Sequence, residues 1–240
     1  MEIIYITLLT ILAGGMGTLT GFGTSTIMVP VLLFWLPLPQ TLLLAGVIHW
    51  FGDIWKITLF RKGFHWKLIF AFGIPGVLTS WFGANIVFSV SEKLLSQILG
   101  GFMMAYVLFL FFKPKFKIPQ NMFIALSGGS LSGFIAGIFG VGGVVRSAFL
   151  SAFDLPKAIY ISTVGMIALL IDTSRIATYI LNGITLERQF LWGFLLFIPA
   201  SFIGAGIAKK IVDHIPQDRF RVVVIVFLFV VGVKFLLFTT

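Results

Sequence analysis

Eight long apolar runs follow one another along this chain, and they constrain its fold more than any other feature. They cover residues 3–36, 41–60, 66–90, 94–112, 122–155, 158–180, 190–208 and 220–238. A membrane crossing takes about 20 apolar residues, so six of the runs have the length of one transmembrane helix. Only 10% of the residues are charged, against about 25% in soluble domains. The sequence therefore predicts an all-helical, polytopic membrane protein with no room for a soluble domain.

The net charge of +9 comes from 17 Lys and Arg residues against 8 Asp and Glu residues. In a membrane protein, Lys and Arg collect in cytoplasmic loops, so the excess indicates orientation rather than a nucleic-acid partner. The absence of Cys excludes disulfides and Cys-ligated metals. Because no basic region precedes the apolar stretch from Met1 to Leu12, we expect a first membrane helix there and not a cleaved signal.

Two runs, 3–36 and 122–155, are too long for one crossing. As continuous helices they would extend about 51 Å at 1.5 Å per residue, whereas the hydrocarbon core is about 30 Å thick. Each contains a glycine-rich patch that weakens a helix, around Gly21 in the first run and Gly140 in the second. We therefore expect both runs to be broken at these patches.

The sequence contains an internal duplication. A shift of 119 positions, the difference between residues 14 and 133, aligns glycines, prolines and an intramembrane acid in one register. The aligned pairs include Gly14 with Gly133, Gly21 with Gly140, Gly23 with Gly142, Pro37 with Pro156, Gly46 with Gly165 and Asp53 with Asp172. The sequence predicts a first membrane repeat over 1–117 and a second over 118–240, together forming one transmembrane domain.

The basic residues decide how the two repeats are oriented. If each long run crosses the membrane once, the loop Lys and Arg residues divide almost evenly between the two sides. If each long run returns as a hairpin, most of them fall on one side, as the positive-inside rule requires. Each repeat then has a broken helix or hairpin plus three transmembrane helices, the repeats are inverted, and the Lys113–Lys117 linker is cytoplasmic. Inverted repeats with broken helices are a common transporter architecture.

Two broken helices at symmetry-related places predict a central binding site. Non-helical backbone inside a membrane must be buried in protein or line a watery cavity, and half-helix N-termini attract anions. Small-residue helix packing, as in Gly17-xxx-Gly21 and Gly133-xxx-Gly137, is the alternative explanation for the glycines. The substrate-binding candidates are Gly21, Gly23, Thr24, Ser25, Gly140, Gly142, Gly143 and Arg146.

Ionisable residues inside a span are functional candidates by default. Asp53 and Lys56 lie three residues apart, and Asp172 and Arg175 repeat this spacing, so each acid can pair with its base. We expect these pairs to flank the route as gates, one towards each side of the membrane. The alternative is a structural ion pair, with Lys56 extending to the surface.

Arg146 follows the second glycine patch and has no acid at helical spacing, which makes it the strongest candidate for charge recognition. Its planar guanidinium matches two oxygens of a sulfite or sulfonate group. The alternative is an Arg146 that extends to the surface or pairs with a distant acid. His49 is a possible proton relay, although a lone His among aromatic residues is more often a packing residue.

The segments 14–39 (GGMGTLTGFGTSTIMVPVLLFWLPLP) and 128–156 (GGSLSGFIAGIFGVGGVVRSAFLSAFDLP) resemble the duplicated glycine-rich signature of the sulfite exporter TauE/SafE family. The resemblance covers the length, the duplication and the placement of both signatures. It implies a bacterial inner-membrane carrier of small sulfur-containing anions such as sulfite or sulfonates. Thr24-Ser25-Thr26 stands where the family pattern has further glycines, which leaves the substrate open.

Other functions fit less well. An intramembrane aspartyl protease needs two carboxylates that share a proton, but here each Asp has a base three residues on. Metal-dependent hydrolysis is disfavoured because the three His residues are scattered and form no His-Glu-x-x-His motif. We expect no metal, no cofactor and no catalytic residue. A passive anion channel and proton-coupled uptake remain alternatives to export. The sequence sets neither the oligomeric state nor the coupling ion.

Overall fold

The computed structural model describes residues 1–112, 119–211, 229 and 233. Within residues 1–211 the described segments form helices and no strand. The helices are α1 (Glu2–Thr20), α2 (Ser25–Leu32), α3 (Leu38–Leu59), α4 (Trp66–Ile86), α5 (Glu92–Phe112), α6 (Met122–Phe139), α7 (Gly142–Leu150), the short 3₁₀ helix η1 (Ser151–Phe153), α8 (Lys157–Leu181) and α9 (Arg188–Ile211). The Lys113–Lys117 linker and nearly all of the run 220–238 lie outside the described residues.

Six of these helices are long and apolar enough to cross a membrane: α1, α3, α4, α6, α8 and α9. Many large apolar side chains on them are exposed, including Phe70, Trp81 and Leu195 at 58%, 52% and 68%. Such an apolar surface is costly in water and is the expected boundary with lipid. The all-helical, polytopic membrane fold expected from the sequence is confirmed.

Both long apolar runs are broken at their glycine patches. α1 ends at Gly21 with φ 73°, and α6 ends at Gly140 with φ 71°. This left-handed conformation is a common helix ending and strongly favours glycine. Pro37 and Pro156 precede α3 and α8 at the same register. The two repeats, aligned by the 119-residue shift, therefore share helix ends and backbone conformations as well as residue types.

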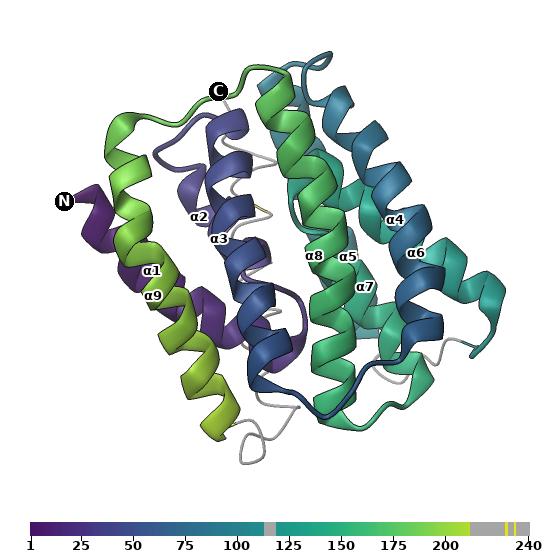
Figure 1. Ribbon diagram of the computed structural model, residues 1–240. Coiled ribbons are helices and arrows are strands. Elements are labelled where there is room, and N and C mark those ends of the chain that lie inside the picture. The colour runs from purple at the N-terminus through teal and green to yellow at the C-terminus, as the bar shows by residue number, and fades with distance from the viewer. Residues whose placement is uncertain (113–118, 212–228, 230–232, 234–240) are drawn as a thin grey trace.

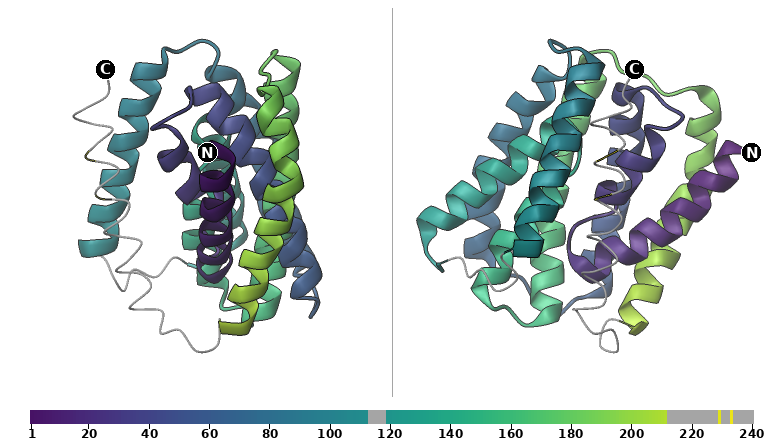
Figure 2. Two further views of the ribbon diagram at one scale, coloured as in Figure 1. Left: turned by 90° about the vertical axis from the view of Figure 1, so that its left-hand side faces the viewer. Right: turned by 180° about the vertical axis from the view of Figure 1, so that it is seen from behind.

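Each broken run turns back on itself instead of continuing across the membrane. The Ser132 hydroxyl donates a 2.9 Å hydrogen bond to the Gly142 carbonyl oxygen, although ten residues of straight helix would separate them by about 15 Å. Figures 1 and 2 show the same reversal in the first repeat, where α2 rises towards the end of the molecule at which α1 begins. Both runs are thus hairpins of two helical pieces.

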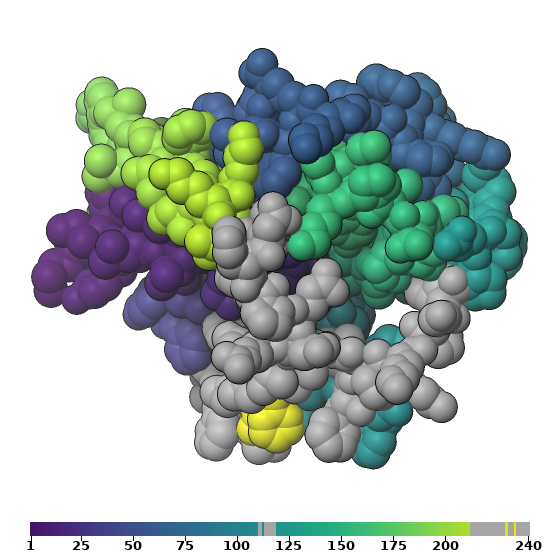
Figure 3. Space-filling model, turned by 90° about the horizontal axis from the view of Figure 1, so that it is seen from below, coloured from purple at the N-terminus to yellow at the C-terminus, as the bar shows by residue number. Residues whose placement is uncertain are grey.

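The helices form two groups around a central pair. α3 and α8 pack against each other and run in opposite directions (Figure 1). α1 packs on α9 on one side of this pair, and α4 packs on α6 and α8 on the other, an arrangement also visible from below in Figure 3. The central pair therefore carries its polar residues into the middle of the bundle.

The described basic loops gather at one end of the molecule. The α3–α4 connection with Arg61 and Lys62, the start of α8 with Lys157 and the end of α9 with Lys209 all lie at the lower end in Figure 1. The α8–α9 connection, which leads to Arg188, lies at the opposite end. This distribution agrees with the hairpin interpretation of the positive-inside rule, in which the lower end is cytoplasmic.

Glycines on α6 serve packing as well as breaking. Methyl groups built on Gly129, Gly133 and Gly137 would lie 2.4, 2.1 and 2.3 Å from backbone oxygens of α4. The two backbones approach this closely only because α6 has no side chains there. The packing alternative is therefore correct for Gly133-xxx-Gly137.

We predict that Gly133→Ala destabilises the fold by about 1–3 kcal/mol, the usual cost of overpacking, because the new methyl group would collide with the Gly76 carbonyl. Thermal unfolding of the purified protein in detergent measures the effect. The matched control is Gly206→Ala, whose methyl group would meet nothing within 4 Å. Equal unfolding temperatures for the two variants would contradict the close α4–α6 contact.

Candidate functional site

The two glycine breaks meet each other at the centre of the bundle. A methyl group built on Gly143, at the start of α7, would come within 1.8 Å of the Phe22 carbonyl oxygen in the first break. A methyl group on Gly21 would lie 3.0 Å from the hydroxyl oxygens of Ser147 and Tyr160. The predicted patches from the two repeats therefore form one contact, in which glycine allows the backbones to touch.

Arg146 is a buried cation that has no ion-pair partner among the described residues. It is 1% exposed, its buried Nε has no hydrogen-bond partner, and its guanidinium is in no hydrogen bond or ion pair given for the described residues. Buried charges in proteins are normally paired because desolvation is expensive. The predicted pairing with a distant acid is absent within the described chain. Nη2 lies close to Gly143, so the guanidinium is beside the meeting point of the breaks.

Two buried hydroxyl oxygens, one in each repeat, also lack hydrogen-bond partners among the described residues. These atoms are the hydroxyl oxygens of Thr24 and Ser147, one residue before α2 and one residue after Arg146 respectively. No side chain caps the N-terminus of α2 or α7, so first-turn amides there have no side-chain acceptor. Unsatisfied buried polar groups are rare in native proteins and call for an explanation.

Arg175 contrasts with Arg146 because its hydrogen-bonding capacity is used. Its Nε donates to Asp172 Oδ1 at 2.7 Å, and its Nη1 and Nη2 donate to the Leu42 carbonyl and the Ser25 hydroxyl at 3.4 and 3.3 Å. Gly140 lies beside the same guanidinium. Arg175 therefore ties α8 to α2 and α3 across the two repeats, and the predicted residues Ser25 and Gly140 contact this arginine.

The two predicted acid–base pairs are present and buried. Lys56 Nζ lies 2.7 Å from Asp53 Oδ1, the same distance as the Arg175–Asp172 contact, and all four side chains are at most 3% exposed. Lys56 is 1% exposed, so the alternative in which it extends to the surface is wrong. At this depth each pair neutralises its own charge.

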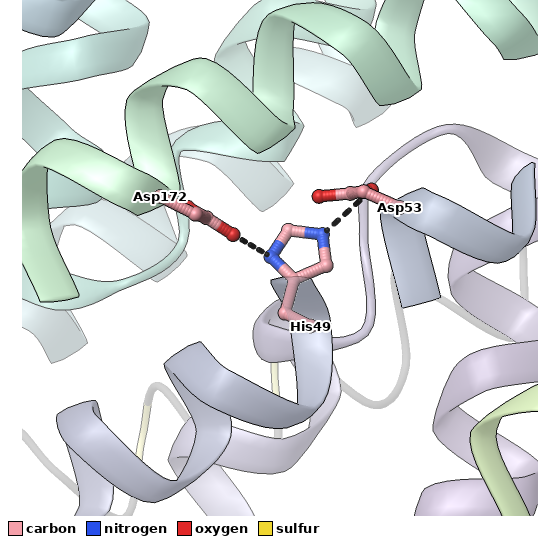
Figure 4. A group of neighbouring side chains, drawn as sticks. All are labelled: His49, Asp53 and Asp172. Atoms are coloured by element: carbon pink, nitrogen blue, oxygen red, sulfur yellow. Dashed lines mark ion pairs between the residues drawn. The ribbon is translucent and has the colours of Figure 1, made fainter. Parts of the chain in front are cut away.

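The sequence alone suggested that the two pairs lie towards opposite sides of the membrane. In the structure they lie close together. His49 connects them: its Nδ1 lies 2.8 Å from Asp172 Oδ2, and its Nε2 lies 3.5 Å from Asp53 Oδ1 (Figure 4). The physical reason is the direct antiparallel packing of α3 and α8, which brings inner positions of both helices together. His49 is thus part of the polar centre rather than an isolated packing residue.

His49 also contacts the first glycine break. A methyl group on Gly23 would lie 2.4 Å from His49 Nε2, so only glycine leaves room for the ring there. Gly23 also has φ 85°, a left-handed backbone conformation that is a second, independent reason for glycine at this position. Gly142 has a different role, because it packs against the Ser132 carbonyl inside the second hairpin.

Sequence reasoning missed Ser147 and Tyr160. Ser147 directly follows Arg146, and Tyr160 of α8 donates a 3.5 Å hydrogen bond to the Ser147 carbonyl. Both side chains face Gly21. Ser147 could have been found as a neighbour of the selected arginine, whereas nothing local distinguishes Tyr160 from other membrane tyrosines.

His49, Asp53 and Asp172 form a buried group whose ligand atoms lie within 4.8 Å of one another. His and carboxylate groups bind metals, but Lys56 and Arg175 already hold these carboxylates. Together with Arg146, the centre has three basic side chains against two carboxylates. The excess of positive charge fits an anion better than a metal ion.

These features define a class: a multi-pass membrane protein in which two broken helices enclose a buried, positively charged centre. A family model described as Sulfite exporter TauE/SafE matches residues 6–235, and the chain belongs to this family. No match to the chain is found among curated proteins. Family membership makes the chain a membrane transporter of sulfur-containing anions.

We predict that Asp172→Asn destabilises the protein by about 3–5 kcal/mol, because it leaves Arg175 as an uncompensated buried charge. Thermal unfolding in detergent measures the loss, with the exposed acid variant Glu187→Gln as the control.

Adding Arg175→Gln to Asp172→Asn should restore part of the lost stability, since the pair is then removed together. A double variant whose loss equals the sum of the two single losses would contradict this coupling.

Proposed function

We propose that this protein is a secondary carrier that exports a small sulfur-containing anion, such as sulfite or an organosulfonate, across the bacterial inner membrane. The observation that carries this proposal is the buried guanidinium of Arg146, which has no ion-pair partner in the described part of the chain and lies at the meeting point of the two glycine breaks. An anion supplied from outside the protein would complete the pairing that the described residues leave open.

The chemistry around Arg146 suits an oxyanion. The planar guanidinium can donate two parallel hydrogen bonds to two oxygens of a sulfite or sulfonate group. The hydroxyl of Ser147, the residue after Arg146, can donate to a further oxygen, and the Thr24 hydroxyl at the start of α2 is a second candidate donor. The uncapped N-termini of α2 and α7 add amide donors and partial positive charge.

The duplication supplies a mechanism of alternating access. We treat 1–117 and 118–240 as inverted repeats, which the opposite directions of α3 and α8 and of α4 and α9 in Figure 1 support. Two equivalent hairpins that meet at one site can open towards opposite sides in turn. The Asp53–Lys56 and Asp172–Arg175 pairs would act as gate contacts that hold the closed arrangement.

The membrane potential favours export. With the cell interior negative, each negative charge that leaves gains about 2.3 kcal/mol per 100 mV. Anion efflux therefore needs no nucleotide hydrolysis, whereas uptake needs a coupled cation. His49, held between two carboxylates, is the residue that supports the alternative of proton-coupled uptake.

We predict that sulfite, thiosulfate or sulfoacetate raises the unfolding temperature of the purified protein in a saturable way, because a ligand that binds only the folded state stabilises it. Arg146→Gln should abolish this shift. The matched control is Arg188→Gln, which removes an exposed arginine at the start of α9 and should leave the shift unchanged. A response to carboxylates alone would reject the proposed substrate class.

Flux through reconstituted vesicles distinguishes a carrier from a channel. We expect uptake of radiolabelled sulfur anion to saturate and to accelerate when the same anion is loaded inside, because a carrier exchanges substrate between two access states.

Arg175→Gln should slow this exchange at least about tenfold, the effect of losing 1.4 kcal/mol. Linear, non-exchanging flux would indicate a passive channel, and unchanged exchange in a folded Arg175→Gln would reject its gate role.

A further inference from the structure

The imidazole of His49 is placed to bind a proton. Both ring nitrogens face carboxylate oxygens, at 2.8 Å from Asp172 and 3.5 Å from Asp53. A neutral imidazole has one N–H and one lone pair, so one nitrogen would point a lone pair at a carboxylate oxygen. The protonated ring has N–H groups on both sides and so matches both acids, between which the ring lies in Figure 4.

A proton on His49 adds to the net positive charge of the centre as long as no anion is bound. The charged described residues around the centre are Asp53 and Lys56 of α3, Asp172 and Arg175 of α8, and Arg146 of α7. Tyr160 and Tyr179 add phenol groups beside the two arginines and no charge near neutral pH. With His49 neutral, this set has one excess positive charge, and a proton on His49 makes the excess two.

A divalent anion at Arg146 balances this larger excess. The buried centre is neutral when a dianion and a proton are present together, and it has a net charge when either is present alone. Uncompensated charge in a low-dielectric interior is the expensive state. The two species therefore favour each other's binding, and by linkage the effect is reciprocal.

The two binding places share one piece of backbone. Gly23 contacts His49 Nε2, and the preceding residue Phe22 contacts Gly143, which in turn lies beside Arg146 Nη2. If binding at His49 or at Arg146 shifts this turn, the packing at the other residue must change, because the backbone contacts at Gly23 and Gly143 are too close to absorb a movement. The Phe22–Gly23 turn thus provides a mechanical connection in addition to the electrostatic one.

We infer that His49 binds one proton together with a divalent sulfur anion and that one transport cycle carries both in the same direction. This inference rests on the proposed anion site at Arg146. It extends the proposed function by assigning the coupling ion and the charge of the substrate: one net negative charge moves per cycle, which remains compatible with export driven by the membrane potential.

Binding calorimetry of the full-length protein in detergent tests the coupling. Thiosulfate and sulfoacetate serve as probes, since both are dianions that do not titrate near neutral pH. We expect their affinity to rise as the pH falls, by up to about tenfold per pH unit, the slope for one linked proton. Buffers of different ionisation enthalpy should reveal uptake of about one proton per anion, because imidazole accepts a single extra proton.

The variant His49→Gln should bind the same anions with no pH dependence and no proton uptake. The matched control is His65→Asn, which removes a histidine that caps α4 and replaces it with a good N-cap residue. It should behave like the wild type. The proton count of the wild-type protein decides the question by itself if His49→Gln does not fold.

The possible failures are distinguishable. Wild-type binding that is independent of pH, or a pH dependence that persists in His49→Gln, overturns the proton coupling and leaves the anion site intact. Failure of every tested sulfur anion to bind the wild type overturns the proposed function, and the coupling falls with it.

Discussion

The cost of burying charge in a membrane protein governs the structure described here. The centre of the bundle contains Asp53, Lys56, Arg146, Asp172 and Arg175, none of which is more than 2% exposed. Four of these form two tight ion pairs, so their burial is compensated locally. Of these five, only Arg146 has no ion-pair partner among the described residues, and our proposal of an anion site rests on this imbalance.

The backbone makes this concentration of charge possible. Because Gly21 and Gly140 end their helices in a left-handed conformation, two short helices turn back inside the bundle and bring uncapped N-termini to its middle. Gly23 and Gly143 then let the breaks approach His49 and each other without side chains in between. The same residue type that weakens a membrane helix thereby builds a polar interior that lipid cannot reach.

Much of this architecture could be predicted from the sequence, because membrane segments obey simple length and charge rules. The broken runs follow from their excess length, and the hairpins follow from the positions of Arg61, Lys62 and Lys209. The i, i+3 pairing of Asp53 with Lys56 is a property of one helix and needs no tertiary information.

The location of the pairs could not be predicted in this way. Whether Asp53 and Asp172 meet depends on how α3 packs on α8, and helix packing is set by side chains from several segments. The contact between His49 and Asp172 could not be predicted for the same reason, because the two residues are distant in sequence. Tyr160 beside Gly21 likewise results from tertiary packing alone.

The central claim is that an anion binds where the two glycine breaks meet. Anomalous diffraction from crystals grown with selenite, a heavier analogue of sulfite, locates such an anion directly. The account predicts a selenium peak within hydrogen-bond reach of the Arg146 guanidinium, between the turns at Gly23 and Gly143. A peak only at the lipid-facing surface or at the basic loops, with Arg146 bonded to a residue of the chain instead, would contradict it.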